Sequence, residues 1–387
     1  MQSIKSKHFS ILQSKRRKEQ LERDRQRRDL QLAYSYLHYI KPRKRREQLL
    51  FMEDGGSMEP VSIPNNETGN KGRKPEALKD WKRRRDFSAT LCVPEWMVEI
   101  PSNLEADWLL VPRPEGKRFI LTSKRGKTTL RSLNGYTKHI KSNLPGSILN
   151  FRGNCVLDVI LSEDAVYVMD ILFFNNVDYS ESEAESRMFT VSSRLSEDAY
   201  IVLLANKQLP VKPVPWQLCS LSWLQQLYGG DVPYPLNGFL FVERCSTLCE
   251  GSSPLQLLWK DAQTATYFID TDAEGRVREV QEVTLLYKNR TLRSLEGLVV
   301  LEATIPAVDD DSLVRCLVRS VSFNSASQTW ELGGVEVKGY ASLSKTLPDT
   351  MSKIVFQQMA RYQPLTVEEI VRHLGWIVCC VRMMAFL

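Results

Sequence analysis

Beyond about residue 88 the chain alternates short apolar runs with turn residues. Runs of strand length, rich in β-branched and aromatic residues, occupy 107–114, 117–124, 154–162, 165–174, 199–205, 238–244 and 265–270. Residues 215–228 have helical spacing instead. This pattern predicts an α+β domain with a mainly antiparallel sheet.

The amino-terminal segment has a different pattern. Residues 14–50 contain no Gly or Pro before Pro42 and consist mainly of strong helix formers, which predicts a helix. Its apolar face is sparse and is made of Leu12, Leu21, Leu30, Leu32 and Leu37. Because so few apolar side chains stand among many charges, we expect this helix to be marginally stable alone.

Two further features complete the predicted organisation. Residues 53–80 are rich in Gly, Pro, Asn and Glu, which indicates a flexible linker. Beyond about residue 290 the pattern weakens, although 296–306 reads as a strand and Thr366 with Glu369 forms a helix-starting capping box. We predict a basic helical arm (1–50), a linker (51–87), the α+β domain (88–290) and a carboxyl-terminal extension of unassigned role (291–387).

The net charge of +6 is unevenly distributed. Residues 1–86 hold 23 Lys+Arg against 12 Asp+Glu, and the remainder holds 29 against 34. A general phosphate-backbone binder more often spreads its positive charge over the folded domain. A basic arm on an acidic body indicates a docking or targeting segment. The cluster Lys41 to Arg46 is also typical of a nuclear localisation signal.

The cysteines and the chain ends suggest no metal site and no membrane span. The eight cysteines show no paired spacing of the zinc-binding kind, and the four histidines lie far apart. The first ten residues lack the apolar run of a secretion signal, so we expect a reducing cytosolic or nuclear setting. Residues 376–387 are apolar but too few to cross a membrane. We expect no cofactor and no membrane partner.

The segment Arg113-Pro-Glu-Gly-Lys-Arg118 is the most informative motif. It resembles the K-x-D-G-x-R motif of the covalent nucleotidyltransferases, the DNA ligases and mRNA capping enzymes. In that family the lysine attacks a nucleotide α-phosphate, so it must first lose its proton. Here Arg113 stands at the lysine position, and a guanidinium stays protonated in proteins. The resemblance therefore implies a capping-enzyme-like fold without a catalytic residue.

Further segments resemble later motifs of the same family, in the same order. Residues 156–160 resemble the DGE motif but keep only Asp158, and 166–172 resemble the strand that follows it. Asn237-Gly238 resembles the (D/E)G motif, whose carboxylate helps to bind metal, and a neutral Asn would hold Mg²⁺ poorly. Residues 257–260 resemble the lysine motif that touches phosphates. The alternative is ordinary strands that meet at glycine turns.

The basic arm and the inactive body together resemble the snurportin family of nuclear import adaptors. The resemblance extends from the arm to about residue 270 and includes 93–102, 116–121, Arg125-Gly126, Gly135-Tyr136 and 252–255. It implies binding of the trimethylguanosine cap of small nuclear RNA within its ribonucleoprotein, importin-β docking through the arm, and recycling by an exportin. It also implies a protein that shuttles between nucleus and cytoplasm.

The resemblance assigns the cap-stacking role to Trp259, and the chemistry of the cap suits an aromatic face. A trimethylated guanine carries positive charge on its ring, which favours stacking and cation–π attraction. Its methylated amine needs an apolar wall, for which Val93, Pro94 and Trp96 are suitable. The phosphate-binding candidates are Lys117, Arg118, Arg131 and Lys260.

Each of these residues also has a structural interpretation. A tryptophan in a strand-rich domain usually packs in the core, and the alternative for Trp96 is that it anchors its segment. The alternative for Arg118 is an ion pair with Glu115 or Asp170, and we expect Asp158 and Asp170 to be structural carboxylates. Two departures from the family pattern matter. Leu133 replaces a lysine, so the phosphate contact is either lost or made by Lys127 or Arg131, and Gln256 is an extra residue before Trp259.

For the arm, we predict helix-in-groove binding to the acidic concave surface of importin-β. The candidate residues are Lys15, Arg16, Arg17, Lys18, Arg23, Arg27 and Arg28. The alternatives are a solvated helix or direct contact with RNA phosphates. For the whole protein, one rival is an active nucleotidyltransferase with Lys117 or Lys124 as nucleophile. The other is a basic-tailed RNA-binding protein without cap preference.

Overall fold

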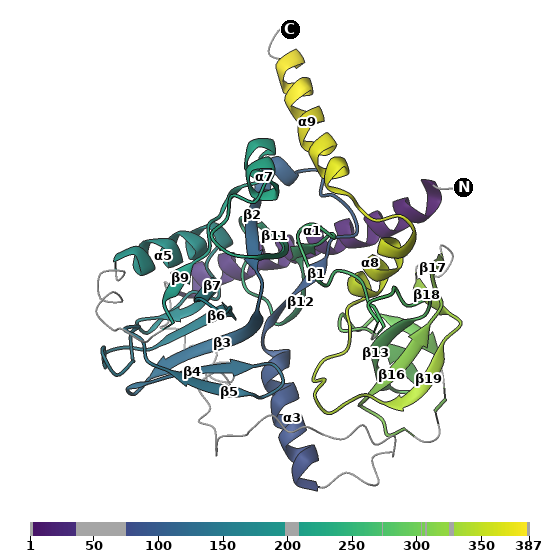
Figure 1. Ribbon diagram of the computed structural model, residues 1–387, viewed down its shortest axis with the longest axis horizontal. Coiled ribbons are helices and arrows are strands. Elements are labelled where there is room, and N and C mark those ends of the chain that lie inside the picture. The colour runs from purple at the N-terminus through teal and green to yellow at the C-terminus, as the bar shows by residue number, and fades with distance from the viewer. Residues whose placement is uncertain are drawn as a thin grey trace. The chain divides into compact units, whose positions relative to one another are not determined.

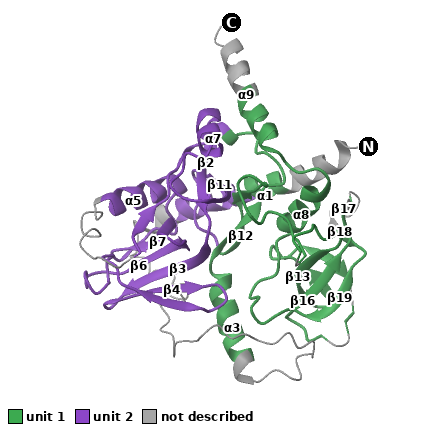
Figure 2. Ribbon diagram, in the orientation of Figure 1, with its two compact units in different colours: residues 1–18, 62–104, 250–387 green, residues 19–61, 105–249 purple. Residues whose placement is uncertain are grey.

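A computed structural model describes residues 3–35, 75–197, 209–272, 274–302, 304–305, 308–324 and 329–384 (Figure 1). The chain divides into two compact units, which Figure 2 colours separately. Unit 1 comprises Met1–Lys18, Ser62–Leu104 and Glu250–Leu387, and unit 2 comprises Glu19–Val61 and Glu105–Cys249. Each unit is described by itself.

Unit 2 is built on a seven-stranded sheet of order β5-β4-β3-β6-β7-β8, in which β9 also pairs with β7. The strands are β3 (Lys117–Lys124), β4 (Lys127–Ser132), β5 (Thr137–Ile140), β6 (Cys155–Leu161), β7 (Val166–Phe174), β8 (Val177–Asp178) and β9 (Val211–Pro213). Every pairing in this sheet is antiparallel except that of β7 with β9.

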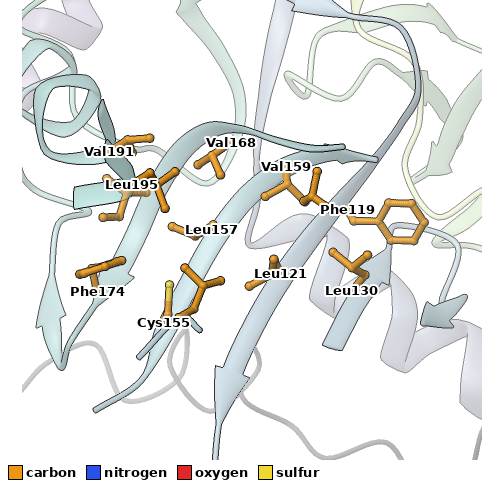
Figure 3. Close-up of a cluster of buried hydrophobic side chains, with 13 residues drawn as sticks. Phe119, Leu121, Leu130, Cys155, Leu157, Val159, Val168, Phe174, Val191 and Leu195 are labelled. Carbon is orange, nitrogen blue, oxygen red and sulfur yellow. The ribbon is translucent and has the colours of Figure 1, made fainter. Parts of the chain in front are cut away.

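One face of this sheet forms the core drawn in Figure 3. Alternate residues of β3 and β6, such as Phe119, Leu121 and Leu157, form one cluster with Val191 and Leu195 of helix α5 (Ala184–Glu197). Because side chains alternate along a strand, Arg118 and Ile120 belong to the opposite face. The core thereby leaves one face of β3 for other contacts.

Three more strands of unit 2 pair antiparallel in the order β11-β2-β10. They are β2 (Trp108–Pro114), β10 (Gln217–Leu218) and β11 (Leu236–Glu243), with the short helix α4 (Leu104–Asp107) before β2. Helix α7 (Leu221–Tyr228) begins at Ser220, whose hydroxyl accepts from the Trp223 amide. A second core, which includes Leu109, Tyr167 and Leu240, packs these strands against β7.

Unit 1 contains a parallel pair, β1 (Cys92–Trp96) with β12 (Gly251–Trp259), and a separate antiparallel sheet of order β15-β14-β13-β16-β19. The latter strands are β13 (Gln281–Lys288), β14 (Thr291–Arg293), β15 (Val299–Glu302), β16 (Ser312–Val318) and β19 (Glu336–Tyr340). Strands β17 (Ser320–Asn324) and β18 (Thr329–Gly333) form a hairpin. Helices α8 (Met351–Tyr362) and α9 (Val367–Met384) follow β19.

The prediction of a mixed α+β fold with mainly antiparallel sheets and an amino-terminal helix is confirmed. The predicted strands at 107–114, 117–124, 154–162, 165–174, 238–244 and 296–306 correspond to β2, β3, β6, β7, β11 and β15. The run 199–205 and the cluster Lys41 to Arg46 lie outside the described residues. Helix α1 (Ser3–Ser35) covers the described part of the predicted arm helix.

Some local predictions were wrong. Residues 265–270 are irregular and form no strand, and of the predicted helix 215–228 only 221–228 is helical. Helix α3 (Pro75–Ala89) occupies the end of the predicted linker. It forms because Trp81 is buried against Leu313 and Leu343, a contact that the Gly- and Pro-rich composition does not reveal.

The predicted boundary at residue 290 falls inside the β13–β14 hairpin. Asn289 and Arg290 form its two-residue turn, and both have positive φ, at 52° and 59°. Paired positive φ values are typical of a type I′ hairpin turn, whose twist matches the flanking strands. Strand β13 therefore belongs with the carboxyl-terminal sheet. In the described part of the chain, no helix is long and apolar enough to cross a membrane.

Candidate functional site

Strand β1 of unit 1 carries Trp96, which is half-buried between a lysine and helix α8. Its ring lies 4.8 Å from that of Phe356 between centroids, and its amide donates to the Ser352 hydroxyl at 3.0 Å. The Lys260 ammonium lies 5.7 Å from the Trp96 ring centroid, within cation–π range. The structure thus brings together two of the predicted cap-binding residues, an aromatic face and a cation.

Trp259 at the end of β12 has a different environment. Its side chain is 0% exposed, and its indole Nε1 donates to the Leu365 carbonyl at 2.8 Å. Leu365 lies between α8 and α9, so the carboxyl-terminal segment contacts the edge of this ring. Stacking of a base on the fully buried Trp259 therefore requires that the residues around it move.

A register shift explains why the two tryptophans differ. Val93 and Pro94 pair with Ser252 and Ser253, but the next residue, Glu95, pairs with Leu257. Residues 254–256 are therefore additional on β12, and they include the Gln256 that the family pattern lacks. Val93 and Pro94 are half-buried and precede Trp96 on β1.

Two phosphate-binding candidates of unit 2, Arg118 and Arg131, share one sheet face, opposite the core of Figure 3, whereas Lys117 lies on the same face as the core residue Phe119. Ile120 pairs with Arg131 on β4 and with Asp158 on β6, and directly paired residues lie on the same face. Arg118 lies two residues before Ile120 and joins them. Its Nε donates to the two Asp158 oxygens at 2.9 and 3.1 Å. Arg118 thus has Asp158 as a structural partner, and Asp170 pairs with the buried Arg187 at 2.8 Å.

Lys117, the first residue of β3, is exposed to solvent. Its ammonium lies 5.2 Å from the Tyr136 ring centroid and 5.7 Å from that of Phe119. An exposed ammonium above aromatic rings is available to a phosphate group without the loss of an ion pair. Lys117 is therefore the phosphate-binding candidate of unit 2 with the most open position among Lys117, Arg118 and Arg131.

Arg113, the residue of the first sequence motif, lies on β2 and is half-buried. Burial, with a smaller effect of the nearby Arg118, lowers the pKa of Arg113 to about 10. At neutral pH the guanidinium therefore remains protonated. Among the described residues, no cluster of three or more His, Cys, Asp or Glu side chains is arranged to hold a metal ion.

The predicted importin-binding residues of helix α1 fall into two sets. Arg16 and Arg17 form ion pairs with Glu95 and Glu99 in unit 1, and Arg27 and Arg28 with Glu181 and Glu183 in unit 2. Lys15, Lys18 and Arg23 are exposed to solvent. Sequence reasoning missed the four glutamates, although the acidic balance of the body was a signal for them. It also missed Ser352, Phe356 and Leu365, for which the sequence offered no signal.

Comparison with known proteins identifies part of the chain. Residues 90–260 match the family model of the Snurportin1 m3G cap-binding domain. This match includes every predicted cap-binding residue, from Val93 to Lys260. The matched family is named for the binding of a cap and not for a reaction.

Among solved structures, the chain is similar to DNA ligases at low identity. The ligase domain of M. tuberculosis LigD is 13% identical, with 65% of this chain and 95% of that chain covered and a TM-score of 0.29. The Chlorella virus DNA ligase-adenylate is 10% identical, with coverages of 64% and 98% and a TM-score of 0.30. A structure named Pmar-Lig_Pre. is 10% identical, with coverages of 68% and 71% and a TM-score of 0.34.

Proposed function

We propose that this chain, whose residues 90–260 match the Snurportin1 m3G cap-binding domain, is a nuclear import adaptor for trimethylguanosine-capped small nuclear RNA. The family match is the observation that carries the proposal. Trp96 adds chemical support, because a half-buried indole with an adjacent cation suits a charged base that is followed by phosphates.

In the proposed complex, the methylated base stacks on an indole of the β1–β12 pair. Trp96 offers a partly exposed face, and Trp259 becomes available when the segment at Leu365 withdraws. The apolar edge of Val93 and Pro94 receives the N-methyl groups. Lys260 then exchanges its contact with the Trp96 ring for the cap phosphates. Lys117, Arg118 and Arg131 are the further cations that we assign to the phosphates and the RNA.

We also propose that the protein is not an enzyme. Arg113 replaces the nucleophile of the nucleotidyltransferases, and its guanidinium stays protonated at neutral pH because its pKa is about 10. The arm supplies the second half of the adaptor, with importin-β as receptor and an exportin for the return path. Such a protein shuttles between nucleus and cytoplasm.

The test is quenching of tryptophan fluorescence by trimethylguanosine, 7-methylguanosine and unmethylated cap dinucleotides. We expect strong quenching by the trimethylated cap. Trp96→Leu and Trp259→Leu should each weaken its affinity by about tenfold or more, since a stacked base contributes roughly 1–3 kcal/mol. Trp81→Leu is the matched control, because Trp81 belongs to neither β1 nor β12 and packs against Leu313 and Leu343.

Other outcomes distinguish the rival functions. Equal quenching by all three caps, or none, would contradict cap recognition. A radiolabelled covalent adduct after incubation with GTP or ATP and Mg²⁺ would establish the nucleotidyltransferase, and Lys117→Arg and Lys124→Arg would then locate it. Binding that is indifferent to cap methylation and falls steeply with salt would indicate a general RNA-binding protein.

A further inference from the structure

Residues 13–17 of helix α1 dock on carboxylates next to the proposed cap site. Arg16 forms an ion pair with Glu95, and Gln13 Nε2 donates to the same carboxylate at 3.1 Å. Arg17 forms an ion pair with Glu99. The Glu95 side chain is 1% exposed, so arm residues and Ser252, whose hydroxyl donates to it at 3.2 Å, shield its charge from water.

A second docking site lies in unit 2, further along the same helix. Arg27 Nε lies 2.8 Å from a Glu181 oxygen, and Arg28 Nη1 lies 2.5 Å from Glu183 and 3.1 Å from the Cys245 carbonyl. Asp24 of the helix adds a contact in which the arm is the acceptor: its carboxylate accepts a hydrogen bond from the Thr247 amide at 3.2 Å. This second site therefore combines ion pairs with a backbone contact that fixes the position of the helix.

These contacts are the physical reason for the helix to stay on the body. A helix with few apolar side chains is marginal in water, and most helical stability in proteins comes from tertiary packing. Over residues 13–30, the part of α1 whose side chains the structure describes, the buried residues are the polar Gln13, Arg17 and Asp24. The arm is thus held by charge and hydrogen bonding, which a competing acidic surface is able to replace.

The docking also has a cost that keeps it reversible. Burial lowers the pKa of Arg17, and its attraction to Glu99 opposes that effect. Taking a guanidinium and a carboxylate out of water costs free energy that their attraction only partly returns. The pairs at Glu181 and Glu183 remain partly exposed, with 20% and 44% of those side chains accessible, so each contributes little alone.

We propose that Glu95 and Glu99 in one unit, and Glu181 and Glu183 in the other, are docking sites for the protein's own basic arm. This inference rests on the proposed function of the arm. A guanidinium that is bonded to these glutamates is not available to the acidic groove of an import receptor. The body therefore competes with the receptor for the arm. The apparent affinity of the receptor is proportional to the fraction of molecules whose arm is undocked. Lys15, Lys18 and Arg23 stay exposed and make the first contact.

The test changes the body and leaves the arm intact. In the full chain, Glu181→Lys with Glu183→Lys replaces the second site by cations, and Glu99→Lys alters the first. Glu163→Lys is the matched control, because Glu163 is an exposed glutamate outside both sites. Hydrogen exchange of residues 13–28 reports docking directly, and titration with importin-β reports receptor affinity.

We expect faster exchange in residues 13–28 of both site variants, and a receptor affinity raised by roughly fivefold or more, with no change in Glu163→Lys. Unchanged exchange in both site variants would overturn the docking sites, whatever importin-β does. Faster exchange with unchanged receptor affinity would overturn the competition. If wild type and all variants fail to bind importin-β while exchange responds as expected, the docking sites stand and the receptor assignment of the proposed function fails.

Discussion

Trp96 and Trp259 look equivalent as residues, each a tryptophan at the end of a strand. Their environments differ because residues 254–256 are additional on β12, which changes the pairing after Pro94. Trp96 keeps a partly exposed face, whereas Trp259 is buried with its indole N–H satisfied by Leu365. The sequence indicated both as site residues, but their exposure depends on a segment more than a hundred positions away.

Glu243 is a residue whose chemistry the sequence did not reveal. It lies at the end of β11, is 4% exposed, and accepts the Cys245 amide at 3.0 Å. Burial is the main cause that raises the pKa of Glu243 to about 7. Between these two pKa values, Glu243 is protonated in the folded protein and ionised in the unfolded chain, whose Glu243 pKa is near 4.5.

This difference predicts a pH dependence of stability. Between about pH 4.5 and 7 the folded state binds more protons than the unfolded state, so the Glu243 contribution declines as pH rises through this window and levels off above it. Glu243→Gln removes the titration and keeps an oxygen for the Cys245 amide. As the pH rises from about 5 to about 8, we expect the free energy of unfolding of the variant to increase relative to that of wild type by on the order of 2 kcal/mol.

Thermal unfolding followed across that pH range measures the difference between Glu243→Gln and wild type. Glu163→Gln serves as the control, because the exposed Glu163 lies outside this buried environment. Melting curves whose midpoints stay parallel for Glu243→Gln and wild type from acid to neutral pH would contradict the assignment.

At the scale of elements, helix α9 begins as its sequence predicts. The Thr366 amide donates to Glu369 at 2.9 Å, and the Glu369 amide donates to the Thr366 hydroxyl at 3.3 Å. This reciprocal pair is the capping box expected from residues 366–369. The capping box immediately follows Leu365, whose carbonyl accepts the Trp259 indole N–H, so the start of α9 and the contact with Trp259 are adjacent.

Thr366→Ala should destabilise this helix start by about 1 kcal/mol, because an orphan amide loses its acceptor. We expect faster hydrogen exchange in the first turn of α9 and a small red shift of tryptophan fluorescence as the segment at Leu365 loosens. Thr366→Ser keeps the hydroxyl and is the control. Identical exchange in the Ala and Ser variants would show that the capping box contributes nothing.

Helix α3 illustrates an element that local sequence could not establish. Residues 75–89 are charged and follow a Gly- and Pro-rich stretch, so a linker was the natural interpretation. The structure shows why a helix forms: Trp81 is buried, its indole donates to the Lys345 carbonyl at 2.8 Å, and Arg85 bonds to Asp311. All of these partners are more than two hundred positions away in the chain.

At the scale of the whole molecule, the charge asymmetry between arm and body has a structural meaning. Ion pairs between exposed or partly exposed groups weaken as salt rises. We expect trypsin to cleave within residues 15–28 faster as salt is raised from about 50 mM to about 500 mM, after correction against an unfolded peptide substrate. The Glu181→Lys, Glu183→Lys variant should be cleaved rapidly at both salt concentrations. Cleavage of wild type that is independent of salt would indicate that the arm is not held by charge.

The sequence by itself determined the features that depend on near neighbours. The capping box at Thr366, the periodicity of strands and helices, the motif around Arg113 and the basic character of the arm all follow from residue types at short spacing. Their physical causes, backbone pairing pattern, local hydrogen bonds and intrinsic pKa, act within a few residues. These features were sufficient to indicate the family that the match over 90–260 supports.

Only the tertiary structure decided which of these groups are exposed and which are paired. Contacts between distant segments include the hydrogen bond of Trp259 to Leu365 and the pairing of arm arginines with Glu95 and Glu181. The raised pKa of Glu243 and the formation of α3 likewise depend on burial within the fold. Burial and electrostatic interaction depend on distance in space, and chain position does not encode that distance directly. The sequence therefore identified the chemical groups, and the fold determined their partners.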